Sequence, residues 1–422
     1  MRNSTVRAVN RLTARWAAEA AGGDGHGQGG TVLTAAGVWP LLALLADGAA
    51  GPARAELAEA LGIPAGDAAA AARNLLDALA GVRGLRSATG LWAAADLPLE
   101  APWTARLPDG TRGTLTGDPD ADGKTLDAWA AERTDGLVER MPVALPEGPD
   151  AVRFVLASAL ALRLKWIRPF SEYPQRMHEG PWAGRELVVL HRTTSLLDRA
   201  KVTHGPAGPV TLLEVVGDTG VDVHLLLGGP DAPPGTVLTT GIEAATRARP
   251  STPVSLLPDG NPGPGLTVRT VCAESPEPWL SVATPAFEVR ADHDLLARAR
   301  LFGLESATDR DSGSFPGISS EPLAVGSARQ SAVARFHATG FEAAAVTAFG
   351  AVGAGLPDLR YRTRHAHARF DRPFGFLAVH RTSRLVLAAG WVTDPLPYEE
   401  PDQEAKEAEE AEEAEEAEFW ED

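Results

Sequence analysis

Apolar residues recur at helical spacing near the start of the chain, and this pattern predicts an amphipathic helix over residues 6–20. Residues 31–46 are apolar on every side, so we expect a buried helix there rather than one on the surface. A third helix is predicted over residues 53–61, because Gly62 and Pro64 follow and stop it. The apolar positions that define the first helix are Val6, Val9, Leu12 and Trp16.

The middle of the chain has the pattern of β-structure. Residues 155–170 (VLASALALRLKWIRPF) are typical of a buried strand followed by a turn. From residue 172 to residue 271 the chain is rich in Gly, Pro and Val, which favours short strands joined by turns. No catalytic motif stands out in that region, so its pattern informs the fold and not the function.

Composition and charge divide the chain into a large body and a short tail. The sequence is 44% hydrophobic with ten tryptophans, which is ample for a sizeable core, and the single cysteine, Cys272, excludes an internal disulfide. Residues 399–422 hold fourteen acidic residues and one lysine, so most of the net charge of −17 lies there. We therefore expect one domain over residues 1–398 and an acidic low-complexity tail over residues 399–422.

The near-neutral body gives no indication of nucleic-acid binding, and no apolar run is long enough to cross a membrane. The first residues are polar and lack the apolar centre of a signal peptide, so the sequence by itself favours the cytoplasm. A local stripe of arginines follows the glycine-rich loop near the end of the body. It is interpreted either as a solvated face or as a contact for a polyanion or another partner; its members are Arg360, Arg362, Arg364, Arg369 and Arg372.

Residues 118–123 match the first half of a calcium-binding loop, with Asp118, Asp120 and Asp122 at alternate positions. The position of its closing carboxylate is Trp129, so we expect a solvated turn that caps the next helix. The motifs G-x-S-x-G, H-E-x-x-H and C-x-x-C do not occur in the sequence. We expect no enzymatic activity, no metal site and no cofactor.

Residues 339–355 (TGFEAAAVTAFGAVGAG) are made almost entirely of small residues and end in alternating glycines. A segment of the form G-x-E-A-A-A-x-T-A is followed by F-x-R-P-F at residues 370–374, and then by a hairpin that ends G-x-V-x-x-P at residues 390–395. In this order and at these spacings the motifs resemble the serpin family. Further matches are Trp166, Phe170, Pro285, Phe287, Phe315, Gly317 and Ile318.

The resemblance implies an α+β serpin fold with a large central mixed sheet, smaller sheets, eight or nine helices and an exposed reactive-centre loop. It also implies inhibition of a serine protease by a suicide mechanism, in which the cut loop inserts into the central sheet and traps the acyl-enzyme. The alternative is a non-inhibitory binding or storage protein with the same fold. We expect a monomer, and family members are often extracellular. The implied hinge consists of Gly340, Phe341, Glu342, Ala343, Ala344, Ala345, Val346, Thr347 and Ala348.

Two counts place the scissile bond differently. Fourteen residues beyond Gly340, in the usual register of the family, lies the bond between Ala354 and Gly355, and a small residue there predicts an elastase- or subtilisin-like target. Counting back from Pro373 points near Arg362 and to a trypsin-like target. We prefer the first count, because the length of the inserted strand is fixed from the hinge.

The sequence departs from the family pattern at the hinge and beneath it. Phe341 stands where the family has Thr or Ser as the first inserted side chain. If the sheet could not accommodate this ring, the protease would cleave the loop without being trapped, and the protein would be only a substrate. The buried polar cluster that holds the central sheet closed is also altered. Its Ser, Ser, Asn and His positions fall on Thr34, Gly37, Ser158 and Gln330.

Overall fold

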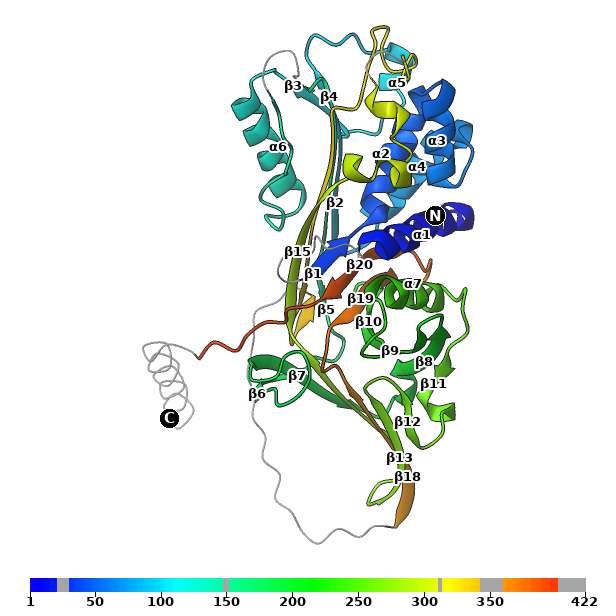
Figure 1. The fold of residues 1–422 in the computed structure, drawn as a ribbon, viewed down its shortest axis with the longest axis vertical. Coiled ribbons are helices and arrows are strands. Elements are labelled where there is room, and N and C mark those ends of the chain that lie inside the picture. Colours follow the sequence, from blue (N-terminus) through cyan, green and yellow to red (C-terminus); the bar gives the residue numbers. More distant parts are fainter. Residues whose placement is uncertain (21–29, 147–151, 310–312, 342–359, 401–422) are drawn as a thin grey trace, which may run out of the picture.

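The computed structural model describes residues 1–20, 30–146, 152–309, 313–341 and 360–400. In this part of the chain eight α-helices surround three large sheets, and two short strands form a fourth sheet, which confirms the predicted α+β architecture. Figure 1 shows an elongated molecule with most helices at one end and strands at the other. The helices are α1 (Asn3–Ala20), α2 (Ala35–Gly48), α3 (Gly51–Leu61), α4 (Ala65–Ala80), α5 (Ala101–Thr104), α6 (Pro119–Arg133), α7 (Pro234–Ala245) and α8 (Ala299–Phe302).

A five-stranded mixed sheet runs through the helical end of the molecule. Its strand order is β15-β16-β4-β2-β3, with parallel pairing between β16 and β4 and between β2 and β3, and antiparallel pairing elsewhere. The strands are β2 (Leu85–Ala94), β3 (Arg112–Leu115), β4 (Phe154–Leu162), β15 (Phe287–Asp294) and β16 (Ser327–Phe336).

Two further sheets form the other end of the molecule. The seven-stranded sheet has the order β1-β20-β19-β10-β9-β8-β11 and the six-stranded sheet the order β12-β13-β18-β14-β7-β6. The strands of the first are β1 (Gly30–Leu33), β8 (Ala200–Gly205), β9 (Gly208–Val216), β10 (Val221–Leu227), β11 (Thr252–Pro253), β19 (Phe374–His380) and β20 (Val386–Val392). Those of the second are β6 (Ser171–Arg176), β7 (Glu186–Thr194), β12 (Gly260–Gly263), β13 (Leu266–Ala273), β14 (Trp279–Pro285) and β18 (Tyr361–Arg369).

Both faces of the five-stranded sheet are covered, because the hydrophobic core is divided into two clusters on either side of it. The larger cluster contains the buried faces of α1, α2 and α4, and the smaller one contains α6 and the residues that follow it. Figure 1 shows α6 on one side of β2 and β4, with α2, α3 and α4 on the other. Every residue of β4 is buried as a result, which explains its unbroken apolar sequence.

Two local predictions can be compared with the structure. The buried apolar run at residues 31–46 divides into strand β1, the N-cap Thr34 and helix α2, so the helix begins later than its apolar pattern indicated. The predicted helix cap is confirmed, since the Asp118 side chain accepts hydrogen bonds from the main-chain N–H groups of Asp120 and Ala121. The predicted solvated turn is wrong, because residues 119–123 already belong to α6 and Asp122 is buried. Asp122 is buried and accepts from the N–H groups of Thr116 and Gly117.

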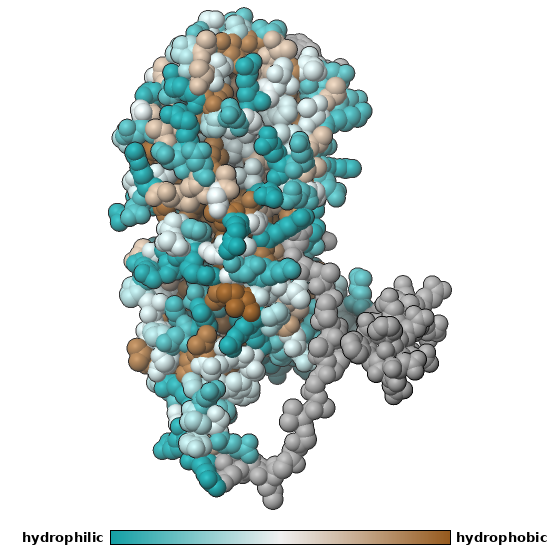
Figure 2. All heavy atoms as spheres, turned by 180° about the vertical axis from the view of Figure 1, so that it is seen from behind, coloured by the Kyte–Doolittle hydropathy of each residue, from teal (hydrophilic) through white to brown (hydrophobic). Residues whose placement is uncertain are grey.

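The described surface is predominantly polar. On the face that Figure 2 presents, apolar side chains form separate patches among polar ones. Within the described ranges, no helix is both long and apolar enough to cross a membrane.

Candidate functional site

The parallel pair of strands at the centre of the five-stranded sheet is the place where an inserted strand would have to enter. Strands β4 and β16 pair over six residues, from Val155 with Ser327 to Leu160 with Ala332. No described strand lies between them. Both strands extend beyond the last pair without further pairing to each other, so their ladder is open at the end from which the predicted hinge leaves.

A short antiparallel pair lies at this open end. Strand β5 (Leu164–Lys165) follows β4 after one residue, and it pairs with β17 (Gly340–Phe341), the first two residues of the predicted hinge. In register, Gly340 lies opposite Lys165 and Phe341 opposite Leu164. The chain therefore already runs antiparallel to the continuation of β4 at the start of the hinge.

The side chain of Phe341 is buried and not displayed on the surface. It is 2% exposed, and its ring centroid lies 6.3 Å from that of Phe376 in β19. The neighbouring Gly340 is required by close packing, because a Cβ atom there would lie 2.3 Å from the carbonyl oxygen of Leu164. At this residue of the implied hinge, close approach to the main chain of β5 therefore excludes a larger side chain.

The residues just before the hinge are held by main-chain and indole hydrogen bonds. The indole Nε1 of Trp166 donates to the carbonyl oxygen of His337 at 2.9 Å, and its main-chain N–H donates to Thr339 at 3.0 Å. The N–H of Phe170 donates to the carbonyl oxygen of Ala338 at 2.8 Å. Sequence comparison matched both aromatic residues without giving them a role, and these bonds show that they anchor the base of the hinge.

The altered polar cluster is brought together beneath α2. The side-chain amide of Gln330 bonds the main chain of Thr34 twice, accepting from its N–H at 2.9 Å and donating to its carbonyl oxygen at 2.8 Å. A Cβ atom at Gly37 would lie 2.5 Å from Oγ of Ser158, so a larger residue there would displace the Ser158 hydroxyl. Ser158 is fully buried, and its hydroxyl has no hydrogen-bond partner in the described part of the protein. The cluster is rebuilt around Gln330, and Ser158 does not contribute a bond to it.

A buried histidine lies at the same level of the sheet. His293 in β15 is the register partner of Gln330, and its Nε2 lies 2.8 Å from the carbonyl oxygen of Val32. Its ring meets the indole of Trp16 edge to face, with centroids 5.0 Å apart. Burial lowers the pKa of His293 below its ordinary value of 6.5, which favours a neutral ring at neutral pH.

Helix α6 covers the face of the central pair of strands opposite to α2. Leu126 and Ala130 of α6 belong to the same buried cluster as Val155, Ala157 and Ala159 of β4. A strand inserted between β4 and β16 would widen the sheet beneath this helix by about 4.8 Å. Insertion therefore requires α6 to shift or to loosen.

Most of the residues predicted for the hinge and the scissile bond lie outside the described residues. These are Glu342 to Ala348 and the pair Ala354 and Gly355. Arg362, the alternative position near the scissile bond, is exposed in β18, where it pairs in register with Cys272 of β13. Within the described ranges, no group of three or more His, Cys, Asp or Glu side chains is placed to hold a metal ion.

Comparison with known proteins decides the family. A sequence model described as "Serpin (serine protease inhibitor)" matches residues 8–183 and 267–395. The chain belongs to the serpin family. Members of this family in general act as protease inhibitors and not as enzymes, so this serpin is not expected to use a catalytic centre of its own.

The relatives of this serpin are distant in sequence. Human plasminogen activator inhibitor 2 is 25% identical over 287 residues, and the match spans 64% of this chain and 60% of that protein. The structure of human thyroxine-binding globulin with thyroxine superposes with a TM-score of 0.68 at 17% identity, covering 93% of this chain and 97% of that one. A serpin from the trematode Schistosoma haematobium has a TM-score of 0.68 at 14% identity, covering 93% and 100%. At these identities the structural matches establish the fold alone.

Proposed function

We propose that this serpin inhibits a serine protease as a suicide substrate. The serine of the protease attacks the scissile carbonyl of the loop, the amine of the following residue leaves, and an ester joins the two proteins. The freed loop then inserts between β4 and β16 as an antiparallel strand. This insertion moves the attached protease with the loop and distorts its catalytic geometry. Inhibitors and non-inhibitory members share the fold, so the proposal depends on the loop.

The observation that carries this proposal is the pairing of Gly340 and Phe341 with β5. An inserted strand has to begin next to the continuation of β4, and the first two hinge residues are already there. Phe341, the residue that departs most from the family pattern, is buried in this position and so needs no further accommodation. The small residues that follow suit a strand packed on both faces, where an oversized side chain costs roughly 1–3 kcal/mol.

The proposed scissile bond is the one between Ala354 and Gly355, and the proposed target is an elastase- or subtilisin-like protease. Support comes from the position of Arg362, whose main chain is engaged in β18 and pairs with β13. A protease must draw the peptide bond into its active site in an extended and accessible form. A bond inside a paired strand meets that requirement poorly.

The test is incubation of the full-length serpin with elastase-, subtilisin- and trypsin-like proteases, followed by denaturing electrophoresis and mass spectrometry. An inhibitor gives a covalent complex that survives boiling in detergent, with cleavage after Ala354. Cleavage without a complex would contradict inhibition and favour a binding or storage protein. A complex cut near Arg362 would overturn the assignment of the scissile bond and not the mechanism.

A variant of the hinge separates insertion from simple cleavage. Ala345→Arg places a charged side chain on the same face of the inserted strand as Phe341, since side chains alternate along a strand. We expect this variant to be cut at the same bond but to form little complex. Ala297→Arg adds the same charge at an exposed position outside the loop and should behave as the parent protein.

A further inference from the structure

A hollow lies where the end of β20 meets the turn between β6 and β7. Its volume is about 780 Å³, within the range of roughly 300–1,000 Å³ that is typical of ligand pockets. Three segments distant in sequence also line it: the β6–β7 turn, the connection from β10 to α7, and residues 369–373, which lead from β18 to β19. They approach each other closely, since a Cβ atom at Gly180 would lie 3.3 Å from the carbonyl oxygen of Asp371.

The lining of this hollow suits an aromatic side chain better than a run of charges. Rigid rings contribute flat apolar surface, and proline loses no side-chain entropy when a ligand packs against it. Two acidic residues, Glu179 and Asp371, also line the hollow and would repel a second cluster of carboxylates. We call it the proline-lined hollow, because four prolines line it beside Trp391: Pro181, Pro230, Pro234 and Pro373.

One cationic side chain of the proline-lined hollow is not neutralised. Asp371 is paired with its neighbour Arg372 at 2.8 Å. Arg369, at the end of β18, is exposed, and within the described ranges its guanidinium forms no ion pair. Burial and, after it, the charge of Arg369 lower the pKa of His367 below its ordinary value of 6.5. Arg369 is therefore available to one carboxylate of a ligand.

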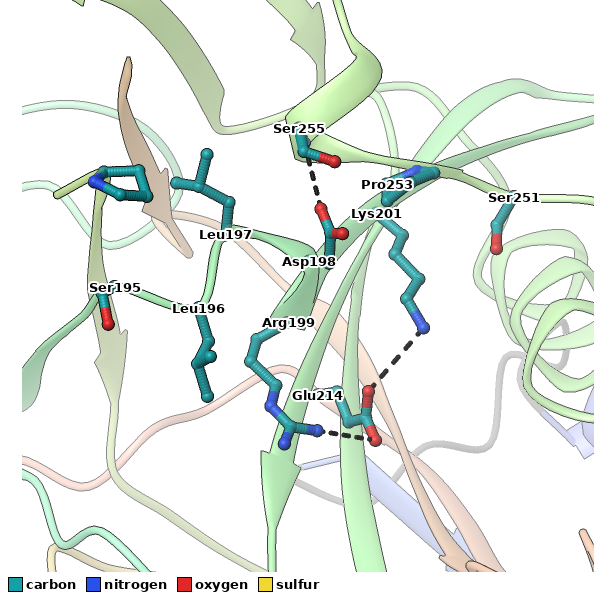
Figure 3. Close-up of a pocket in the computed structure, with 11 residues that line it drawn as sticks. Ser195, Leu196, Leu197, Asp198, Arg199, Lys201, Glu214, Ser251, Pro253 and Ser255 are labelled. Carbon is teal, nitrogen blue, oxygen red and sulfur yellow. Dashed lines mark hydrogen bonds and ion pairs between the residues drawn. The ribbon is translucent and has the colours of Figure 1, made fainter. Parts of the chain in front are cut away.

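A hollow of similar size elsewhere lacks this feature. It has a volume of about 770 Å³, and Figure 3 shows that Arg199 and Lys201 in its lining both point to the carboxylate of Glu214. The distances to this carboxylate are 3.2 Å from Arg199 and 3.7 Å from Lys201. These cations are already engaged within the protein, whereas Arg369 is not.

The chain itself passes the proline-lined hollow shortly before the acidic tail begins. Thr393 lines the hollow, and the chain then runs beside the start of β7, where the N–H of Tyr398 donates to the carbonyl oxygen of Glu186 at 3.0 Å. Glu400, the last described residue, is seven residues beyond Thr393 and so at most about 25 Å from it. Residues 401–418 lie outside the described residues, and a chain of that length can span up to about 60 Å, which is ample for a return.

The tail ends in an aromatic pair that its composition does not explain. Residues 401–418 contain no aromatic side chain, and Phe419 and Trp420 then stand together before Glu421 and Asp422. Acidic segments that stay in solvent are poor in aromatic residues, because such rings are stabilised by burial. The pair is also flanked by carboxylates, one of which can pair with a free arginine.

We propose that the proline-lined hollow binds the end of this chain, residues 418–422. The rings of Phe419 and Trp420 pack against the prolines and Trp391, and the carboxylate of Glu418 or Glu421 pairs with Arg369. The polyanionic stretch before residue 418 stays outside, where Glu179 does not repel it. The proposal is independent of the inhibitory mechanism, since none of these residues belongs to the hinge or to the central pair of strands.

The test compares the full-length protein with its variant Phe419→Ser/Trp420→Ser, in which the tail no longer fills the hollow. A fluorescein-labelled peptide of residues 415–422 reports its own binding by fluorescence anisotropy. We expect saturable binding to one site of the variant, and at least about tenfold weaker binding to the parent protein, because the attached tail competes at high effective concentration. Equal binding to both proteins, or no binding to the variant, would overturn the proposal.

A second pair of substitutions locates the peptide. In the Phe419→Ser/Trp420→Ser protein, Arg369→Gln should weaken peptide binding roughly tenfold, through the loss of one charged hydrogen bond. The matched control is Arg269→Gln, at an exposed arginine of β13 outside the hollow, and it should leave the affinity unchanged. Equal losses in the two variants would mean that the peptide responds to charge in general, and would contradict binding in the hollow.

Size-exclusion chromatography at rising protein concentration decides whether the tail docks on its own chain. We expect the parent protein to remain a monomer. A dimer that is lost in the Phe419→Ser/Trp420→Ser variant would show that the tail is exchanged between two copies, and would overturn docking within one chain.

Discussion

The structure gives the side chain of Phe341 a different role from the one that its sequence position suggested. In the sequence it is a bulky exception at the first position of the hinge, where it could obstruct insertion. In the structure its ring is buried near Phe376, and the chain on which it lies already pairs with β5. It therefore contributes to the intact protein as a core residue and fixes the start of the loop.

The stability of a Phe341→Ala variant tests this role. Removing a buried ring should lower the free energy of unfolding by roughly 3 kcal/mol, because contacts are lost and a cavity remains. Chemical denaturation of the intact protein measures the change. The control Tyr361→Ala removes a ring that is 45% exposed and should cost less than about 1 kcal/mol. If both variants unfold like the parent, the ring of Phe341 is not part of the core.

At the scale of single elements, α6 and the pair β4 and β16 are mechanically linked. Helix α6 shares a buried cluster with β4, so any widening of the sheet disturbs it. Its first turn is secured by Asp118, whose carboxylate accepts from two main-chain N–H groups at 3.0 and 3.1 Å. The strength of this cap bears on how readily the sheet can open.

Asp118→Ala should therefore weaken α6 and ease insertion. We expect a loss of about 1 kcal/mol in the free energy of unfolding, from the missing cap. We also expect the cut loop to insert faster in this variant. The increase in thermal stability that follows cleavage should therefore develop sooner than in the parent protein. Asp120→Ala makes the same change in charge in the first turn of α6 but leaves the cap of Asp118 in place, so its effect should be smaller. Equal effects of the two variants would show that charge and not capping matters.

For the molecule as a whole, histidines whose pKa is lowered by folding couple stability to pH, and His224 and His293 are the buried ones among them. Burial is the first cause that lowers the pKa values of His191, His224, His293, His367 and His380 below the ordinary 6.5. Below about pH 6.5 these histidines therefore bind protons more readily in the unfolded chain than in the folded one. Stability from these groups is present above that pH and is lost as the pH falls towards their folded pKa values.

Denaturation at pH 7, 5.5 and 4.5 measures this effect. His224, with a pKa of about 4, should by itself account for a loss on the order of 3 kcal/mol across the full range from pH 6.5 to 4. The variant His224→Gln cannot take up a proton and should depend less steeply on pH than the parent. The control His204→Gln changes an exposed histidine of β8 and should retain the steep dependence. Identical slopes in all three proteins would contradict the role of His224.

The sequence by itself determined the features that depend on close neighbours along the chain. The amphipathic pattern of α1, the cap at Asp118 and the buried strand β4 follow from local spacing and propensity. The small residues after Gly340 and the motif at residues 370–374 resemble the family for the same reason. The boundary between β1 and α2 was missed, because an unbroken apolar run suits a buried strand and a buried helix equally well.

Only the tertiary structure decided which distant groups meet. Local periodicity does not specify that Phe341 lies beside β5, that the amide of Gln330 reaches the main chain of Thr34, or that Arg369 and Trp391 line one hollow. Each of these contacts closes a long segment of chain, and its formation depends on how all three sheets pack. Burial and close approach, which give Gly340, Gly37 and Phe341 their roles, exist only once that packing is complete.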